Sequence, residues 1–187
     1  MRLLASMRVA MVGVTVLAWA LGACAADAPA HKYLGAAKCS VCHGSEAKGN
    51  QFGVWKKTAH ARAYDALAGE AALKIAKEKG LAKPPQQSDE CLKCHVTGFG
   101  KPAATFDATY KKEEGVTCEA CHGPGSDYKT ISVMKDQAAA IAAGLVLPDE
   151  KTCTQCHNKE SPVFKGFVFK EYVAKIAHPN PLRAAAK

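Results

Sequence analysis

The sequence is poor in methionine and in long apolar runs. Of the four methionines in the 187 residues, only Met134 lies outside the first 23 residues. Beyond residue 23, no stretch is long and apolar enough to span a bilayer. Phosphate-binding loops, hydrolase nucleophile elbows and paired metal sites are also missing from the pattern. The sequence therefore gives no sign of a channel, a nucleotide enzyme or a hydrolase.

Residues 1–23 have the pattern of a secretory signal peptide. Arg2 and Arg8 precede the apolar run VAMVGVTVLAWALG, and small residues follow it. This run is too short and wrongly flanked for a spanning helix. The letters LGAC resemble a bacterial lipobox, in which Cys24 would carry a lipid, whereas ACA fits a cleavage site that discards Cys24. We expect an exported protein, in the periplasm, as an outer-membrane lipoprotein or outside the cell.

Eight of the nine cysteines fall into four C-x-x-C-H motifs. A cysteine-rich exported chain is often a disulfide scaffold, but a histidine after every second cysteine argues against that here. The motifs begin at irregular spacings, which excludes a solenoid of equal repeats. They are Cys39-Ser-Val-Cys42-His43, Cys91-Leu-Lys-Cys94-His95, Cys118-Glu-Ala-Cys121-His122 and Cys153-Thr-Gln-Cys156-His157.

The motif C-x-x-C-H is the attachment signature of a c-type haem. Its two cysteines reach the two vinyl groups on one porphyrin edge, and the histidine supplies the proximal ligand of the iron. Zinc ribbons use paired C-x-x-C units but need no histidine after each pair. A thioredoxin-like site would need a βαβ pattern, which the chain lacks. The sequence therefore predicts four haems c, with His43, His95, His122 and His157 as proximal ligands.

The basic charge follows from this cofactor load and does not indicate nucleic-acid binding. The formal net charge is +8, and it falls to +6 without Arg2 and Arg8. Four haems bring about eight propionates, and each ferric core restores about one positive charge, so the oxidised holo-protein is near about +2. Some lysines then remain to dock an acidic redox partner.

The second axial ligands must come from few residues. Outside the motifs, the chain offers three histidines and one methionine, which are His31, His60, His178 and Met134. His60 lies close to aromatic residues at a predicted helix start, and His178 follows the last predicted helix. His31 lies eight residues before the first motif, on a tail that could serve its own chain or a neighbour's haem. Met134 also fits a packed helical stripe.

The fold is predicted to be mainly α with extensive loops, as one tetrahaem domain over residues 31–187. Apolar periodicity predicts helices over residues 58–79, 131–143 and 168–177. Gly80 and Gly144 mark the ends of the first two. Residues 81–90 are predicted to be a linker, and no stretch reads as a strand. With about 41 residues for each haem, the porphyrins must form much of the core.

The chain resembles the cytochrome c-554 family of exported tetrahaem cytochromes. The likeness rests on AKCSVCH followed by WKKTAHARA, on CLKCHVTGFG, on GVTCEACHGPG and on KTCTQCH. It implies closely packed haems, three with two histidines and one open, and electron transfer from an oxidoreductase, in the founding case one that oxidises hydroxylamine. His60 and His178 match family distal ligands. The family's further distal histidine, shortly after HGPG, is missing here, while His31 is present upstream, as in related cytochromes of metal-reducing bacteria.

Three functions fit these residues. The leading one is an electron carrier between redox proteins. The second is a haem enzyme that reduces a small nitrogen oxide at a five-coordinate iron, with Glu119, Asp127 or Tyr128 as proton donor. The third is a subunit of an extracellular cytochrome filament, in which self-association through His31 completes a neighbour's haem.

Overall fold

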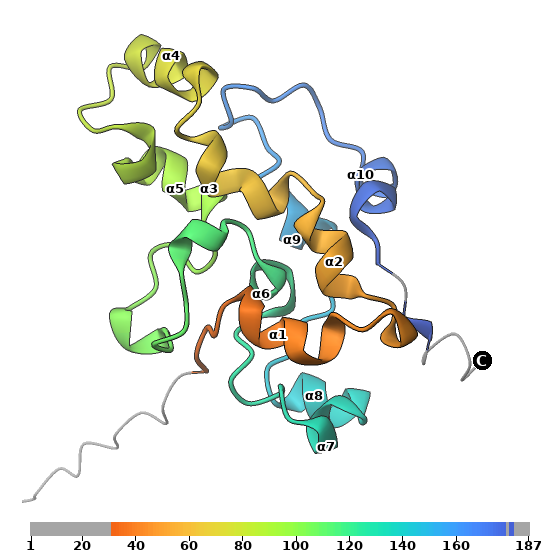
Figure 1. Cartoon of the computed structure of the whole chain (residues 1–187). Helices are drawn as coiled ribbons and strands as arrows, with labels where there is room; N and C mark the ends of the chain where they lie inside the picture. The colour runs from red at the N-terminus through yellow and green to blue at the C-terminus, as the bar shows by residue number, and fades with distance from the viewer. Residues whose placement is uncertain (1–30, 179, 182–187) are drawn as a thin grey trace, which may run out of the picture.

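The computed structural model describes residues 31–178 and 180–181, and within them every regular element is helical (Figure 1). The signal peptide and Cys24 lie outside the described residues. Tyr33 and Phe106 form one isolated bridge. The α-helices are α1 (Ala36–His43), α2 (Gln51–Lys56), α3 (Ala63–Ala66), α4 (Glu70–Glu78), α5 (Asp89–His95), α6 (Cys118–His122), α7 (Ile131–Met134), α8 (Gln137–Ala142), α9 (Glu150–Thr154) and α10 (Phe169–Ile176).

Two of the three predicted helices are each broken into shorter pieces. The segment predicted as one helix over 58–79 forms a 3₁₀ turn at His60–Arg62, then α3 and α4. Gly69 interrupts it, because glycine is costly inside a helix but acceptable as the N-cap that it provides for α4. The segment 131–143 divides at Asp136, whose carboxylate accepts hydrogen bonds from two N–H groups at the start of α8. Asp136 is therefore a cap, which periodicity alone did not reveal.

The third predicted helix is confirmed as α10. Its half-buried residues are Phe169, Tyr172, Val173 and Ile176, and the residues between them are exposed. The predicted linker 81–90 contains a 3₁₀ turn at Pro85–Gln87. Its predicted end is wrong, because α5 already begins at Asp89. No helix among the described residues is long and apolar enough to cross a membrane.

Each C-x-x-C-H motif lies on or at the end of a short helix. In α1, α5 and α6 the motif forms the last turn, and in the fourth motif α9 ends one residue after Cys153. Positions i, i+3 and i+4 lie on one face of a helix. The two cysteines and the histidine of a helical motif therefore share a face, which is the arrangement that a covalently attached haem requires.

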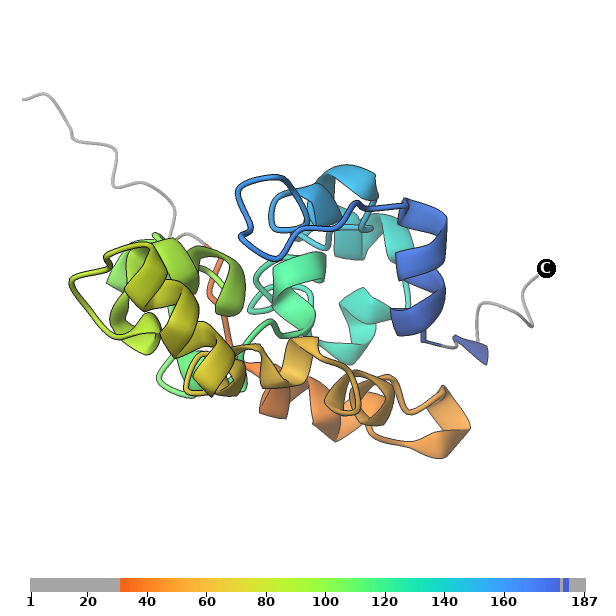
Figure 2. The ribbon, with the colours of Figure 1, turned by 90° about the horizontal axis from the view of Figure 1, so that it is seen from above.

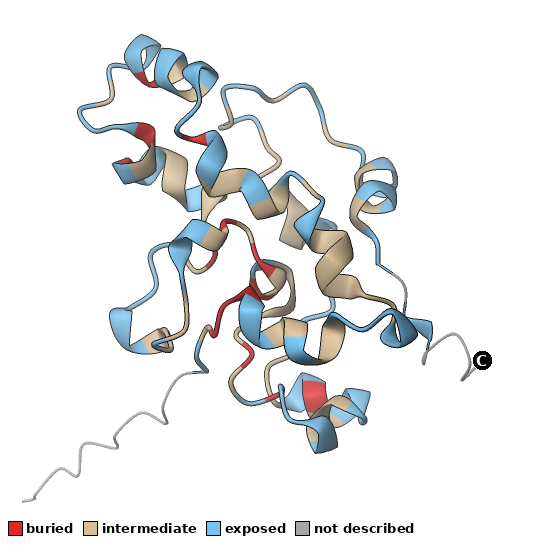
Figure 3. Cartoon of the chain, in the orientation of Figure 1, coloured by how far each residue is buried: buried red, intermediate tan, exposed pale blue. Residues whose placement is uncertain are grey.

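The apolar core of the described chain is small. Six hydrophobic residues are buried, and three of them are alanines. Figure 3 shows most of the chain as half-buried or exposed. Seen from above in Figure 2, the short helices run in different directions and do not form layers. So little buried apolar surface supports little folding free energy by itself, and a protein of this kind needs additional apolar mass in its interior.

A buried carboxylate joins the N-terminal segment to the third motif. Glu119, inside that motif, is 2% exposed. Its oxygens accept hydrogen bonds from the N–H groups of Leu34 at 2.9 Å, Gly35 at 2.8 Å and Gly125 at 2.7 Å. Burial raises the pKa of this carboxyl, although the three N–H groups act in the opposite direction. The contact fixes residues 34–35, α6 and the turn after His122 relative to one another.

Replacing Glu119 with alanine should destabilise the fold strongly. Three buried N–H groups would lose their acceptor, at about 1–3 kcal/mol each before water or rearrangement offsets part of the loss. We expect the holo-protein to lose about 3 kcal/mol of unfolding free energy in a guanidinium titration followed by far-ultraviolet circular dichroism. Glu78→Ala, on the exposed face of α4, is the matched control. We call the hydrogen bonds of Glu119 to Leu34, Gly35 and Gly125 the Glu119 clamp. Equal unfolding midpoints for the two variants would show that this clamp contributes nothing to the unfolding free energy.

Candidate haem-binding site

The four motifs are neighbours in space in a linear order, here called the file, which differs from their order in the sequence. The thiols of Cys39 and Cys118 are neighbours, and their interaction raises the pKa of Cys39 and lowers that of Cys118, which joins the first motif to the third. Burial, and then the neighbouring Cys153, raises the pKa of Cys121 to about 11. Burial, and then Cys94, raises the pKa of Cys156 to about 12. The motifs therefore follow one another as first, third, fourth and second.

Other contacts agree with this order. Lys93 of the second motif forms an ion pair with Glu160, just after the fourth motif, at 2.5 Å. Burial lowers the pKa of His122, and nearby His43 lowers it further, which places the first motif beside the third. In Figure 1, α1 lies next to α6, while α5 lies away from both, beside α3.

Three motif histidines are oriented by oxygen acceptors at Nδ1. His95 Nδ1 lies 2.6 Å from the carbonyl oxygen of Ala63, and His122 Nδ1 lies 3.1 Å from that of Val146. His43 Nδ1 lies 3.2 Å from Oε1 of Gln51. A metal-binding histidine usually donates its other ring N–H in this way, which fixes the tautomer and leaves Nε2 as the metal ligand. These three imidazoles are therefore set up to bind iron through Nε2.

Two pairs of imidazole rings have centroid separations that suit one iron between them. The ring centroids of His60 and His157 are 6.0 Å apart, and those of His122 and His178 are 5.9 Å apart. Two imidazoles on opposite sides of a metal, each bonded at about 2 Å, have centroids about 6 Å apart. The third and fourth motifs therefore each place a histidine opposite a histidine from elsewhere in the chain.

This geometry fits a porphyrin better than a bare metal ion. Among the described residues, no group of three or more His, Cys, Asp or Glu side chains is arranged to hold a metal. A pair of imidazoles is too few ligands for a tetrahedral zinc site. A porphyrin supplies four equatorial nitrogens itself and needs only two axial ligands from the protein. The pairs thus match a haem and argue against the zinc alternative.

The chain segment before the third motif positions His60. The Val116 N–H donates to the carbonyl oxygen of His60 at 3.1 Å, and the Trp55 indole N–H donates to that of Val116 at 2.8 Å. Gly115 has φ +74°, and a Cβ there would lie 2.9 Å from the same His60 oxygen. Only glycine allows both that dihedral and that approach. Burial lowers the pKa of His60, so its imidazole is neutral and able to bind metal near pH 7.

The second pair depends on the C-terminal helix. His178 lies two residues after the end of α10, and burial, then the nearby His122, lowers its pKa. In the fourth motif, the His157 ring stacks on Phe167 with centroids 5.2 Å apart and contacts Tyr172 of α10 at 5.5 Å. The half-buried face of α10 thus packs on the fourth motif, while His178, just beyond the helix, lies at the third.

The other predicted residues lie elsewhere. Met134 ends α7 and is half-buried. His31 Nδ1 lies 2.6 Å from Oδ2 of Asp127. Among the described residues, no second imidazole ring faces His43 or His95 as in the two pairs.

The three proton-donor candidates all have structural partners. Glu119 accepts three backbone hydrogen bonds, as described above. Asp127 accepts from His31, and the Tyr128 hydroxyl donates to the carbonyl oxygen of Gly123 at 2.7 Å. These contacts explain all three side chains without a catalytic role.

Comparison with known proteins places this geometry in a family. The family model described as cytochrome c554 and c-prime matches residues 30–123. The chain belongs to the cytochrome c554 family. It is 35% identical over 158 residues to cytochrome c-554 of Nitrosomonas europaea, covering 76% of this chain and 63% of that protein. It therefore spans less than two thirds of that relative's length.

A solved structure shows the same fold. The reduced state of cytochrome c554 from Nitrosomonas europaea superposes with a TM-score of 0.50 at 27% identity, covering 84% of this chain and 82% of that one. As a member of this family with four C-x-x-C-H motifs, the chain is a c-type cytochrome with four haems c. The predicted family, fold class and cofactor are confirmed.

Two features of the site were missed at the sequence level. The order of the motifs in space has no signal along the chain, because it depends on contacts between cysteines far apart in sequence. The role of Gly115 had a weak signal, since a glycine three residues before the first cysteine of a haem motif suggests close backbone approach.

Gly115→Ala should loosen His60 without unfolding the protein. The added methyl group would displace the His60 backbone, so we expect carbon monoxide to bind one more reduced haem than in wild type. Gly100→Ala is a matched control, because Gly100 has φ +75° and no atom within 4 Å of its Cβ position. Both variants place an L side chain at a positive φ. Equal carbon monoxide counts in the two variants would contradict the positioning role.

Proposed function

We propose that this cytochrome carries electrons between redox partners through its file of four haems. The observation that carries the proposal is the two pairs of neighbouring imidazoles, one at the third motif and one at the fourth, in the middle of the file. When bound, each haem iron supplies a one-electron couple between the ferric and ferrous states. An iron held by two imidazoles has no coordination position left for a substrate, so these two sites suit electron transfer and not catalysis.

The roles of the residues follow from this proposal. The eight motif cysteines attach the rings, and His43, His95, His122 and His157 are proximal ligands. His60 is the distal ligand opposite His157, and His178 is the distal ligand opposite His122. The chain holds these histidines from the backbone, through Gly115 for His60 and through α10 for His178, so that ligand positions change little with redox state.

The two ends of the file are the proposed points of electron entry and exit. The first motif, on α1, exposes Val41 at 80%, and the second motif, on α5, lies at the opposite end (Figure 1). We propose that residues 31–187 act as one tetrahaem unit on the exported side of the membrane, in keeping with the predicted signal peptide. Redox proteins are the expected partners, and lipidation at Cys24 stays a prediction.

A reductive titration tests the electron-carrier proposal. We expect the anaerobic holo-protein to take up four electrons per molecule from dithionite. Ferricyanide should then reoxidise all four haems, and the visible spectrum should be unchanged over repeated cycles. The enzyme alternative predicts instead that the reduced protein consumes nitrite or hydroxylamine with turnover. Such turnover, at a rate above reoxidation by ferricyanide, would overturn the carrier proposal.

Removing either distal histidine should open one iron. His60→Ala and His178→Ala should each bind carbon monoxide at one more reduced haem than wild type, and the double variant at two more. Lys57→Ala and Lys175→Ala lie within three residues of the two histidines and serve as controls that keep the wild-type count. A single substitution that leaves the count unchanged would remove that histidine from the ligand set.

A further inference from the structure

We propose that His31 is the second axial ligand of the iron carried by the first motif, and that Asp127 is the residue that positions it. This inference rests on the proposed function, because it assumes that the motif histidines hold haem iron. It assigns a ligand to an iron for which the described residues show no facing imidazole, and it uses a residue from outside the motifs.

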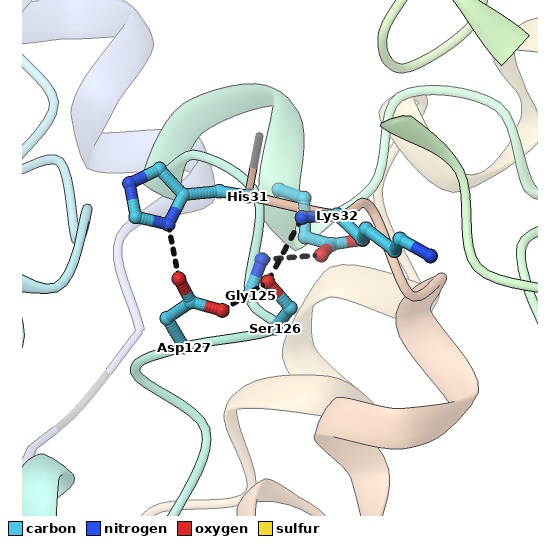
Figure 4. A network of polar contacts seen from close by, with 6 residues as sticks. His31, Lys32, Gly125, Ser126 and Asp127 are labelled. Carbon is cyan, nitrogen blue, oxygen red and sulfur yellow. Dashed lines mark hydrogen bonds and ion pairs between the residues drawn. The ribbon is translucent and has the colours of Figure 1, made fainter. Parts of the chain in front are cut away.

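His31 has the polar partners of a metal-binding histidine. Its Nδ1 lies 2.6 Å from Oδ2 of Asp127, and the other oxygen of that carboxylate accepts from the Ser126 hydroxyl at 2.6 Å (Figure 4). A carboxylate acceptor at Nδ1 selects the tautomer whose Nε2 lone pair is free for a metal, and raises its basicity.

The backbone also holds His31 against its own chain. The Lys32 N–H donates to Oγ of Ser126 at 2.8 Å, and the Ser126 N–H donates to the carbonyl oxygen of Lys32 at 3.2 Å. Two residues further on, Leu34 enters the Glu119 clamp. The imidazole is therefore fixed at both its ring and the adjacent peptide. Ordering these groups costs conformational entropy.

The position of His31 selects the iron. Its ring lies 3.4 Å from where a Cβ of Gly144 would be, and the Gly144 carbonyl lies against Gly123, the residue after His122. His31 is thus beside the third motif, whose iron already has His122 and His178. The next motif in the file is the first, because Cys39 contacts Cys118. The second motif lies beyond the fourth, so His43 is the remaining proximal ligand that is nearest to the third motif along the file.

The test is a carbon monoxide titration of the full-length, reduced holo-protein. His31→Ala should bind carbon monoxide at one more haem than wild type, at every protein concentration. Added imidazole should restore the six-coordinate low-spin spectrum and block the new site, which a purely structural role would not produce. Asp127→Ala should open the same iron only partly, with carbon monoxide binding there about 10-fold more weakly than in His31→Ala.

Two controls keep the result decisive. Lys32→Ala removes a side chain that this arrangement does not use and should keep the wild-type count, while Met134→Leu tests the competing ligand. An extra carbon monoxide site in Met134→Leu and not in His31→Ala would overturn the proposal. So would an open haem in wild type that closes as protein concentration rises, since that would place His31 on a neighbouring molecule. Four-electron uptake in all variants shows that the electron-carrier function stands independently of this outcome.

Discussion

The structure depends on one constraint, which is that an iron-binding histidine must share a helix face with two cysteines. A single helical turn satisfies this when the residues are at i, i+3 and i+4. Each motif therefore needs only a short helix, and the chain uses helices of five to eight residues at the three motifs that lie wholly within one. The rest of the chain is free to bring a second imidazole to the opposite side. That task explains the long irregular connections and the small apolar core.

The Glu119 clamp shows how the chain compensates for that small core. Inside the third motif, a carboxylate replaces apolar packing with three hydrogen bonds from backbone N–H groups. A buried carboxylate is stabilising only when it is well hydrogen-bonded, because desolvation of its charge is expensive. Its partners are the segment leading to the first motif and the turn after the third. One side chain therefore sets the distance between two neighbouring haem attachment sites.

The sequence predicted the chemistry of this protein better than its geometry. The four motifs predicted haem attachment because covalent chemistry fixes residue identity at adjacent positions. Helix lengths were overestimated at residues 58–79 and 131–143, because Gly69 and Asp136 act as caps and apolar periodicity does not register a cap. The order of the motifs could not be predicted, since the contact of Cys39 with Cys118 joins residues far apart in the chain. His60 and His178 were selected as distal candidates from their places beside predicted helices and from the family resemblance, but their partners became apparent only from the ring distances.

The arrangement of ligands along the file bears on how the protein divides its tasks. In the proposed ligand set, the two middle motifs take their second imidazoles from segments that the backbone and α10 hold firmly. At one end, His31 is held by the carboxylate of Asp127 on a half-exposed surface. At the other end, the described residues bring no second imidazole to His95. An iron with two fixed imidazoles changes its geometry little on reduction, whereas a less saturated terminal iron can respond to a partner or a small ligand. In the proposed ligand set, the interior of the file therefore serves electron transfer, and only the end at His95 has a single histidine among the described residues.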